Sequence, residues 1–292
     1  MKQPLTTDSP VRTSPIDSRH GDFECFLGFA SGRYTRTHGP FWFGVALVLT
    51  VLSWIALIPF RETYFGKIIT SGWQTNWLCI LFTWWCLCIL YAKFLKVRVQ
   101  RRAFDIQGLF PVRTDFVLSP GTSGDVLQRI AQRVARPREY LLFNRVWMAL
   151  SNLGNIGEVR DVGAVLDSQA DNDSSTIDAS YTALRALIWT IPVLGFIGTV
   201  IGLGTAIGSF TDVIASGDSA SGGANTNSIR EKLSPVVGGL ATAFNTTLVA
   251  LVAAVGIQLL STYVFKLEED LLDDCAKYCN NNITSRLKLT DW

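Results

Sequence analysis

Three threonines and an asparagine stand near the middle of two long uncharged stretches in the second half of the chain. Thr199 lies 12 residues before Thr211, and Thr247 lies 12 residues after Pro235. At 1.5 Å per helical residue, both hydroxyls are roughly 18 Å from one end of their stretch. Hydroxyls that face each other at such a depth can line a wetted path or hold an ion. A lone threonine more often bonds the backbone carbonyl four residues earlier, but a matched set favours an ion path: Thr199, Thr246 and Thr247, with Asn245 beside them.

The same two stretches contain no Asp, Glu or His. Proton relays inside membranes use these side chains. The chain alone therefore cannot load and release protons by titrating its own membrane side chains. If it drives ion flow, a partner must supply the carboxylate.

Four stretches without charged residues or histidine can cross a bilayer: 41–60, 76–92, 186–211 and 233–265. A spanning helix needs about 20 apolar residues, whereas membrane barrels show segments of alternating polarity, which are not visible here. The sequence therefore predicts an all-α membrane protein with four transmembrane helices. The fourth stretch has 33 uncharged residues, or roughly 50 Å of helix, so its helix should project beyond the bilayer.

Basic residues are unevenly placed along the chain. Twelve Lys and Arg lie in 93–182, against two in each of the loops 61–75 and 212–235. Because basic segments are retained inside, we expect a multi-pass protein of the bacterial inner membrane with both termini cytoplasmic. The expected segments are a cytoplasmic 1–40 with a short amphipathic helix at 22–31, transmembrane helices one and two in 41–97, a cytoplasmic helical segment at 98–182, transmembrane helices three and four in 183–265, and a cytoplasmic C-terminal helix at 266–292.

The segment 98–182 is expected to be helical. Val126, Ile130 and Val134 recur every four residues before Pro137, which predicts a helix that ends there. Further helices are expected at 139–152 and 155–168, then a polar linker at 169–174, and then a helix that starts at Ser175 and continues into the third span. The segment carries no nucleotide-binding loop, no Cys/His cluster and no Ser/His/Asp set. We therefore expect no enzyme activity, no cofactor, no metal site and no nucleic-acid binding.

Small residues separate the last two spans from the first two. Gly198 and Gly202 are four apart on span three, as are Gly204 and Gly208. Span four carries two rows of small residues at every fourth position: Gly239, Ala243 and Thr247, and Thr242, Thr246, Ala250 and Ala254. Such rows let helix backbones approach closely. They fit either spans three and four at the centre of an oligomer or the packing of a monomeric four-helix bundle.

Two motifs in these spans resemble those of the MotA/TolQ/ExbB proton-channel family. Residues 191–203, IPVLGFIGTVIGL, are similar to the family's proline-opened Leu-Gly-x-x-Gly-Thr-Val-x-Gly motif, and residues 245–256, NTTLVALVAAVG, to its Thr-Thr-x-x-Gly-Leu-x-x-Ala-Ile-Pro motif. Gly256 stands where the family has a proline. The four-span layout resembles MotA more than the three-span TolQ and ExbB.

The resemblance implies a stator or energiser subunit that couples proton or Na⁺ flow to rotation. It implies a homopentamer around a dimer of a single-span partner similar to MotB, TolR or ExbD, whose membrane Asp carries the ion. By position, Thr199 and Thr247 match the family's pore-facing threonines, with Thr246 adjacent. The other residues expected to pack the helices or face the pore are Pro192, Gly195, Gly198, Gly202, Asn245 and Ala250. A non-conducting membrane scaffold is the alternative.

Overall fold

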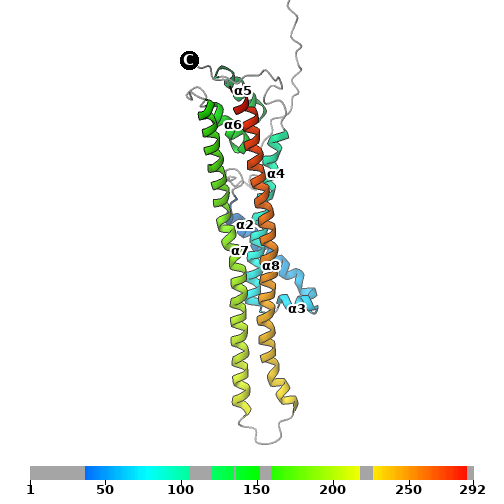
Figure 1. The fold of residues 1–292 in the computed structure, drawn as a ribbon. Helices are drawn as coiled ribbons and strands as arrows, with labels where there is room; N and C mark the ends of the chain where they lie inside the picture. The colour runs from blue at the N-terminus through cyan, green and yellow to red at the C-terminus, as the bar shows by residue number, and fades with distance from the viewer. Residues whose placement is uncertain are drawn as a thin grey trace, which may run out of the picture. The chain divides into compact units, whose positions relative to one another are not determined.

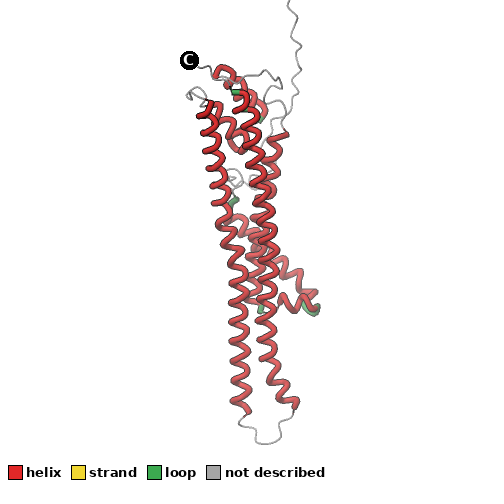
Figure 2. The backbone as a smooth tube through the Cα atoms, in the orientation of Figure 1, coloured by secondary structure: helices red, strands yellow, loops and turns green. Residues whose placement is uncertain are grey.

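The computed structural model describes residues 37–70, 72–105, 120–134, 136–151, 159–217 and 226–287. The elements in these ranges are α-helices and short 3-10 helices (Figures 1 and 2). Four of the helices are long and apolar enough to cross a membrane, within Gly39–Phe60, Thr75–Phe104, Asp161–Thr211 and Leu233–Arg286. The predicted fold class is therefore confirmed. The amphipathic helix expected at 22–31 lies outside the described residues.

The chain divides into two compact units. The first, which we call the membrane unit, comprises Thr37–Phe94 and Ile177–Lys266. The second, which we call the polar unit, includes the described parts of Leu95–Thr176 and Leu267–Trp292. Each unit has its own packing and is described by itself.

In the membrane unit, helix α2 spans Gly39–Leu57 and is followed by a 3-10 turn, Ile58–Phe60. Its start is favoured by Pro40, whose fixed φ suits the first helical turn. Only one face of α2 is buried, through Trp42, Ala46 and Thr50 at four-residue spacing. The remaining surface is apolar and exposed, as expected for a helix that faces lipid.

A short helix, α3 (Tyr64–Thr70), leads into α4 (Trp73–Arg101). The turn between them contains Gly72 at φ +66°, a left-handed conformation that favours glycine. Asn76 closes the end of α3, because its side-chain amide donates to the Ile69 carbonyl at 2.8 Å. Such a bond satisfies one of the carbonyls that a helix end leaves open.

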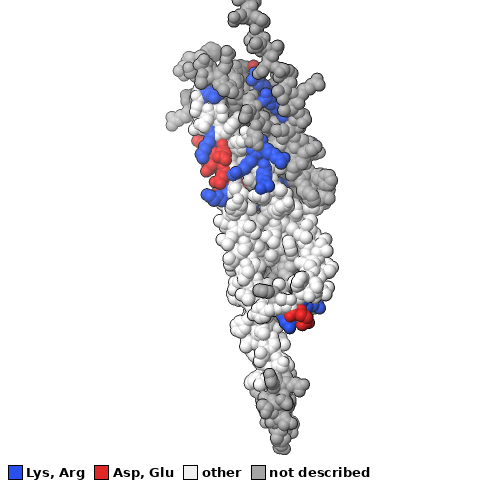
Figure 3. All heavy atoms as spheres, turned by 90° about the vertical axis from the view of Figure 1, so that its right-hand side faces the viewer, with Lys and Arg blue, Asp and Glu red and all other residues white. Residues whose placement is uncertain are grey.

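Helices α7 (Val159–Gly217) and α8 (Thr226–Asn282) supply the rest of the membrane unit. Both pass through prolines, Pro192 in α7 and Pro235 in α8, without ending. Helix α8 begins at Thr226, before Pro235, so this proline lies inside the helix. In Figure 3, Lys, Arg, Asp and Glu among the described residues leave a broad uncharged band on the face shown, which fits immersion in a bilayer.

The polar unit is built from α5 (Pro120–Arg133), α6 (Leu141–Ser151), and parts of α4, α7 and α8. Its buried core includes the periodic residues expected from the sequence, Val126, Ile130 and Val134. Further core residues come from α6, α7, α8 and the residue after α8, and they include Leu142, Val146, Ala149, Leu150, Val162, Leu166, Leu271, Cys275, Cys279 and Ile283.

The linker expected at 169–174 was wrong. Helix α7 runs through it without a break, so the separate helices expected at 155–168 and from Ser175 are one. The buried stripe of this helix continues across the polar run, through Leu166, Asp173, Ile177 and Tyr181. Asp173 occupies a core position there because it is ion-paired, and the other polar residues of 169–174 are exposed or half-buried.

Candidate functional site

Three glycines of α7 bring its backbone against α8. A Cβ added at Gly195 would lie 2.6 Å from the Ala250 Cβ, and one at Gly202 would lie 2.9 Å from the Ala243 backbone nitrogen. A Cβ at Gly198 would meet the Thr246 hydroxyl at 2.7 Å. No side chain fits at these distances without a shift, so the small residues allow the close approach. We call this line of contact the seam.

The close approach places two hydroxyls together across the seam. Thr199 Oγ1 and Thr247 Oγ1 are 2.9 Å apart, and either can be the donor. Thr199 is also within 3.0 Å of the Gly195 carbonyl, four residues earlier. Thr247 is within 3.2 Å of the Ala243 carbonyl and 3.3 Å of the Gly195 carbonyl. Both threonines are half-buried. We call Thr199 and Thr247 the hydroxyl pair.

The hydroxyl pair has more acceptors than protons. Each threonine supplies one O–H donor and two acceptor lone pairs, and the Gly195 and Ala243 carbonyls accept as well. When both hydroxyls donate to carbonyls, their lone pairs can accept a proton donor or contact a cation. When one hydroxyl turns away from its carbonyl, it becomes a donor for an anion. A neutral pair of this kind can therefore contact either protonation state of a carboxyl group without titrating itself.

Thr246 lies on the other side of the seam. It is fully buried and donates to the Ala243 carbonyl at 2.9 Å. Its methyl group would lie 2.7 Å from a Cβ added at Gly72, so it packs against the turn before α4. One residue turns a helix by about 100°, which separates Thr246 from Thr247. The α3–α4 turn thus covers one side of the seam, and the hydroxyl pair lies on the opposite side.

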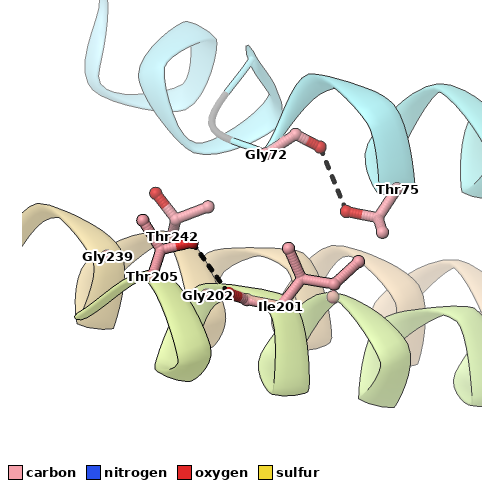
Figure 4. A pocket seen from close by; sticks show the side chains of 8 residues that line it. Gly72, Thr75, Ile201, Gly202, Thr205, Gly239 and Thr242 are labelled. Carbon is pink, nitrogen blue, oxygen red and sulfur yellow. Dashed lines mark hydrogen bonds between the residues drawn. The ribbon is translucent and has the colours of Figure 1, made fainter. Parts of the chain in front are cut away.

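A cavity of about 350 Å³ opens beside this turn, on the same side of the seam as Thr246. Figure 4 shows its lining, which combines glycines with threonine hydroxyls from α4, α7 and α8: Gly72, Thr75, Gly202, Thr205, Gly239 and Thr242. Thr75 donates to the Gly72 carbonyl at 3.1 Å and Thr205 to the Ile201 carbonyl at 2.9 Å, so both hydroxyls have backbone acceptors.

The segment that forms the seam matches a known family. Residues 148–274 match the model of the MotA/TolQ/ExbB proton channel family. This part of the chain is therefore similar to that family. The match begins near the end of α6 and ends within the polar part of α8, so it contains all nine site residues expected from the sequence. Comparison with curated proteins and with solved structures gives no match.

The match indicates the class of protein that the chain resembles. The chain is a multi-pass membrane protein with four candidate spans and a channel-family core. Channels of this family are transporters and not enzymes. Family members work with partners of the MotB, TolR or ExbD type.

The remaining expected residues occupy different places. Pro192 is half-buried inside α7, next to Ile191, whose carbonyl is 4.0 Å from the Cys79 sulfur. Ala250 is fully buried in the seam against Gly195. Asn245 is half-buried and lies two residues from the seam residue Ala243, which turns it to the opposite face of α8. The ion-path role of these side chains stays a prediction.

Sequence reasoning missed the contribution of the α3–α4 turn. Gly72 and Thr75 lie against Gly198, Thr242 and Thr246, and no sequence pattern connects these two sets of residues. The available signal was Gly72 itself, because an isolated glycine between two helices favours a turn at positive φ. Its packing partners depend on tertiary structure and have no local signature.

Proposed function

We propose that the chain is the ion-conducting stator or energiser subunit of a proton- or Na⁺-driven motor. In this proposal five copies surround a dimer of a single-span partner similar to MotB, TolR or ExbD, and ion flow turns one against the other. The observation that carries the proposal is the contact of 2.9 Å between Thr199 and Thr247 across the seam. The family match of this segment supports it.

The partner is needed because the four uncharged stretches lack Asp, Glu and His. In the proposed cycle, a partner carboxyl approaches the hydroxyl pair in its protonated state and donates its proton to a threonine oxygen as a hydrogen bond. When the carboxyl group releases its proton to water on the cytoplasmic side, a threonine hydroxyl turns and donates a hydrogen bond to the carboxylate instead. The pair thereby offers polar contacts to both states at a depth where water is scarce.

The proposed orientation toward the partner follows from the two sides of the seam. The α3–α4 turn and α4 occupy the side that holds Thr246 and Thr75. The hydroxyl pair is on the other side, where Phe196 and Leu203 expose 58% and 40% of their surface. Apolar side chains around a polar pair suit a dry contact with a single-span helix. In the pentamer, we propose that this side faces the partner and that α2 faces lipid.

We further propose that both termini and the polar unit are cytoplasmic, from the excess of Lys and Arg in 93–182. Cysteines introduced at Ser174 and Ser221 in intact cells should respond oppositely to a membrane-impermeant thiol reagent. Labelling at Ser221 and protection at Ser174 is the expected result. The reverse pattern would overturn the orientation.

The decisive experiment replaces the hydroxyl pair. Thr199→Val and Thr247→Val nearly conserve side-chain volume but remove the hydroxyls. In proteoliposomes that contain the complex with its partner, each variant is expected to lower ion flux at least about tenfold, which corresponds to about 1.4 kcal/mol in a barrier. Native mass spectrometry should still find a pentamer, because a membrane hydrogen bond contributes only about 0.6 kcal/mol on average.

Thr205→Val is the matched control. Thr205 is also a threonine of α7 and also donates to the carbonyl four residues earlier, but it lies outside the hydroxyl pair. Its flux should stay within about twofold of the unchanged protein. Thr246→Val, measured separately in the same flux assay, tests the predicted role of Thr246 in the ion path.

A membrane scaffold without ion flux is the second candidate function. The observation that favours it is that Thr199 and Thr247 each have a backbone acceptor on their own helix, Gly195 and Ala243 respectively. Such bonds serve packing as well as conduction. Unchanged flux in the Thr199/Thr247 double variant would remove the ion path and leave the scaffold.

A further inference from the structure

A buried ion pair joins three helices of the polar unit. Arg145 of α6 donates through Nε to Asp173 Oδ2 of α7 at 2.7 Å, and both side chains are only 2% exposed. Gln169 donates to the other carboxylate oxygen at 2.9 Å. Arg145 Nη1 lies 3.5 Å from the Leu272 carbonyl of α8. The Asp173 carboxylate is therefore held on both oxygens.

Arg145 is less completely satisfied than Asp173. Its Nη2 is buried and has no hydrogen-bond acceptor among the described residues. A guanidinium group has five N–H donors, and leaving donors buried without an acceptor is unfavourable by an amount comparable to a lost hydrogen bond. A buried unpartnered donor of this kind calls for a ligand or solvent molecule on its open side.

Arg145 lines a cavity of about 450 Å³ between α7 and α8. Small residues leave this space open. No atom lies within 4 Å of a Cβ added at Gly163, and Ala170 and Ala276 form other parts of the wall. A volume of this size accommodates a small metabolite.

The polar groups of the cavity include two cationic side chains. Lys277, Asn280 and Thr284 line it together with Arg145, and Asp167 is its one carboxylate. Asp173, which neutralises Arg145, does not belong to the lining. The formal charges balance, because Asp173 neutralises Arg145 and Asp167 offsets Lys277. The unsatisfied Arg145 donor and the Lys277 ammonium group are therefore the two features that favour an anionic group in the cavity. Asp167 can accept a hydrogen bond from a hydroxyl or amino group elsewhere on the same ligand.

We propose that this cavity is a binding site for a small organic anion, whose carboxylate or phosphate group lies against Arg145 and Lys277. The ligand is a soluble one and not a lipid headgroup. Cys279, in the cavity wall, lies 14 residues beyond Phe265, the last uncharged residue of the fourth stretch, which is roughly 21 Å along a helix. A bound anion links α7 to α8, the two helices that also form the seam.

The test uses the full chain in detergent and follows its thermal unfolding with increasing inorganic phosphate or succinate, at constant ionic strength set with sodium chloride. A ligand that binds only the folded protein raises the unfolding temperature in a saturable way. Saturable stabilisation by at least one of the two anions at millimolar concentration is expected. Calorimetric titration of the same anion should give one site per chain.

Variants of the wall and rim locate the site. Gly163→Leu fills the cavity and should abolish the saturable response, and Lys277→Gln, at an exposed rim position, should weaken the affinity at least severalfold. Gly124→Leu is the matched control, because Gly124 also lies in a helix of the polar unit with no atom within 4 Å of an added Cβ, but outside the cavity. Its response should equal that of the unchanged protein.

Two results would overturn the site. Absence of saturable stabilisation by either anion would mean that water alone fills the cavity. An equal response in the unchanged protein, Gly163→Leu and Lys277→Gln would place the anion effect elsewhere on the surface. The Gly163→Leu result is used only if this variant unfolds cooperatively in the absence of anion. If Gly163→Leu does not unfold cooperatively, the response of Lys277→Gln alone tests the site.

Discussion

Helix α7 contributes to two buried polar clusters that are built on different principles. In the membrane unit, Thr199 and Thr247 are neutral, half-buried and backed by carbonyls of their own helices. In the polar unit, Arg145 and Asp173 are charged and nearly inaccessible, and they are held by the Gln169 side chain of α7 and the Leu272 backbone carbonyl of α8. A hydroxyl that keeps a backbone acceptor can exchange its partner at little cost. A buried charge cannot, because losing its partner leaves it desolvated. The hydroxyl pair is therefore suited to exchanging hydrogen bonds with a group that moves past it. The Arg145–Asp173 ion pair is suited to holding helices in one fixed arrangement.

Removing the guanidinium group of Arg145 is expected to have the largest effect. Arg145→Met leaves the Asp173 carboxylate buried without its cation, and breaking such a pair destabilises a protein by about 3–5 kcal/mol. Thr199→Val should cost only about 0.6 kcal/mol. Denaturant unfolding in detergent, followed by the exposure of Cys275 and Cys279 to a thiol reagent, measures the first effect. An equal loss of unfolding free energy in Arg145→Met and Thr199→Val would contradict the proposed difference between the two clusters.

Overfilling the seam is expected to have the next largest effect. A side chain at Gly202 meets backbone atoms of Ala243 and Gly239 at 2.9 Å, and these cannot move aside as a flexible side chain can. Gly202→Val should therefore destabilise the membrane unit by about 1–3 kcal/mol. Gly204→Val is the matched control, since no atom lies within 4 Å of a Cβ added at Gly204. Thermal unfolding of both variants in the same detergent gives the comparison, and equal destabilisation would refute the seam as the packing constraint.

A smaller effect is expected from two buried thiols near the ion pair. Burial raises the pKa of Cys275 from 9.0 to about 12 and that of Cys279 to about 11, although Arg145 lowers both. Because the unfolded thiols lose their protons at lower pH than the folded ones, stability is retained below about pH 9 and falls as pH rises toward 11–12. Unfolding measured from pH 8 to pH 11 should show this slope. The Cys275→Ala/Cys279→Ala variant should show a shallower slope, and an unchanged slope would contradict the assignment.

The smallest effect is expected at the surface of the polar unit. Arg136 and Glu139 form an ion pair at 3.0 Å, but both side chains are 43% exposed. Exposed pairs contribute about 0–1 kcal/mol. Arg136→Gln should therefore change the unfolding free energy by less than about 1 kcal/mol, measured beside Arg145→Met. A loss as large as that of Arg145→Met would show that burial does not distinguish the two arginines.

Much of the fold could be predicted from the sequence because hydropathy and periodicity are strong signals. The four spans follow from uncharged stretches, and the buried positions Val126 and Ile130 of α5 follow from four-residue spacing. The equal depth of Thr199 and Thr247 could also be predicted from the sequence. It follows from the rise per helical residue and from the ends of the two uncharged stretches. Their role in ion flow stays a prediction.

The polar unit was harder to predict because its polar residues are fixed by tertiary contacts. The run at 169–174 has the composition of a linker, yet Asp173 is a core residue through its pair with Arg145. Helix propensity is a weak guide when tertiary contacts decide. Arg145 within the apolar run 141–150 was the available signal, because an arginine on a buried helix face needs a carboxylate partner.

The left-handed turn at Gly72 also constrains the order of biosynthesis. Its packing partners Thr242 and Thr246 lie on α8, which is synthesised after α2, α4 and α7. The hairpin of α2 and α4 therefore enters the bilayer before α8 is present. Until then it is stabilised by the surrounding lipid and by its own aromatic contacts, such as that of Phe43 with Trp85. The turn can dock only after α8 has entered the bilayer, so the membrane unit is completed only once α8 has been synthesised.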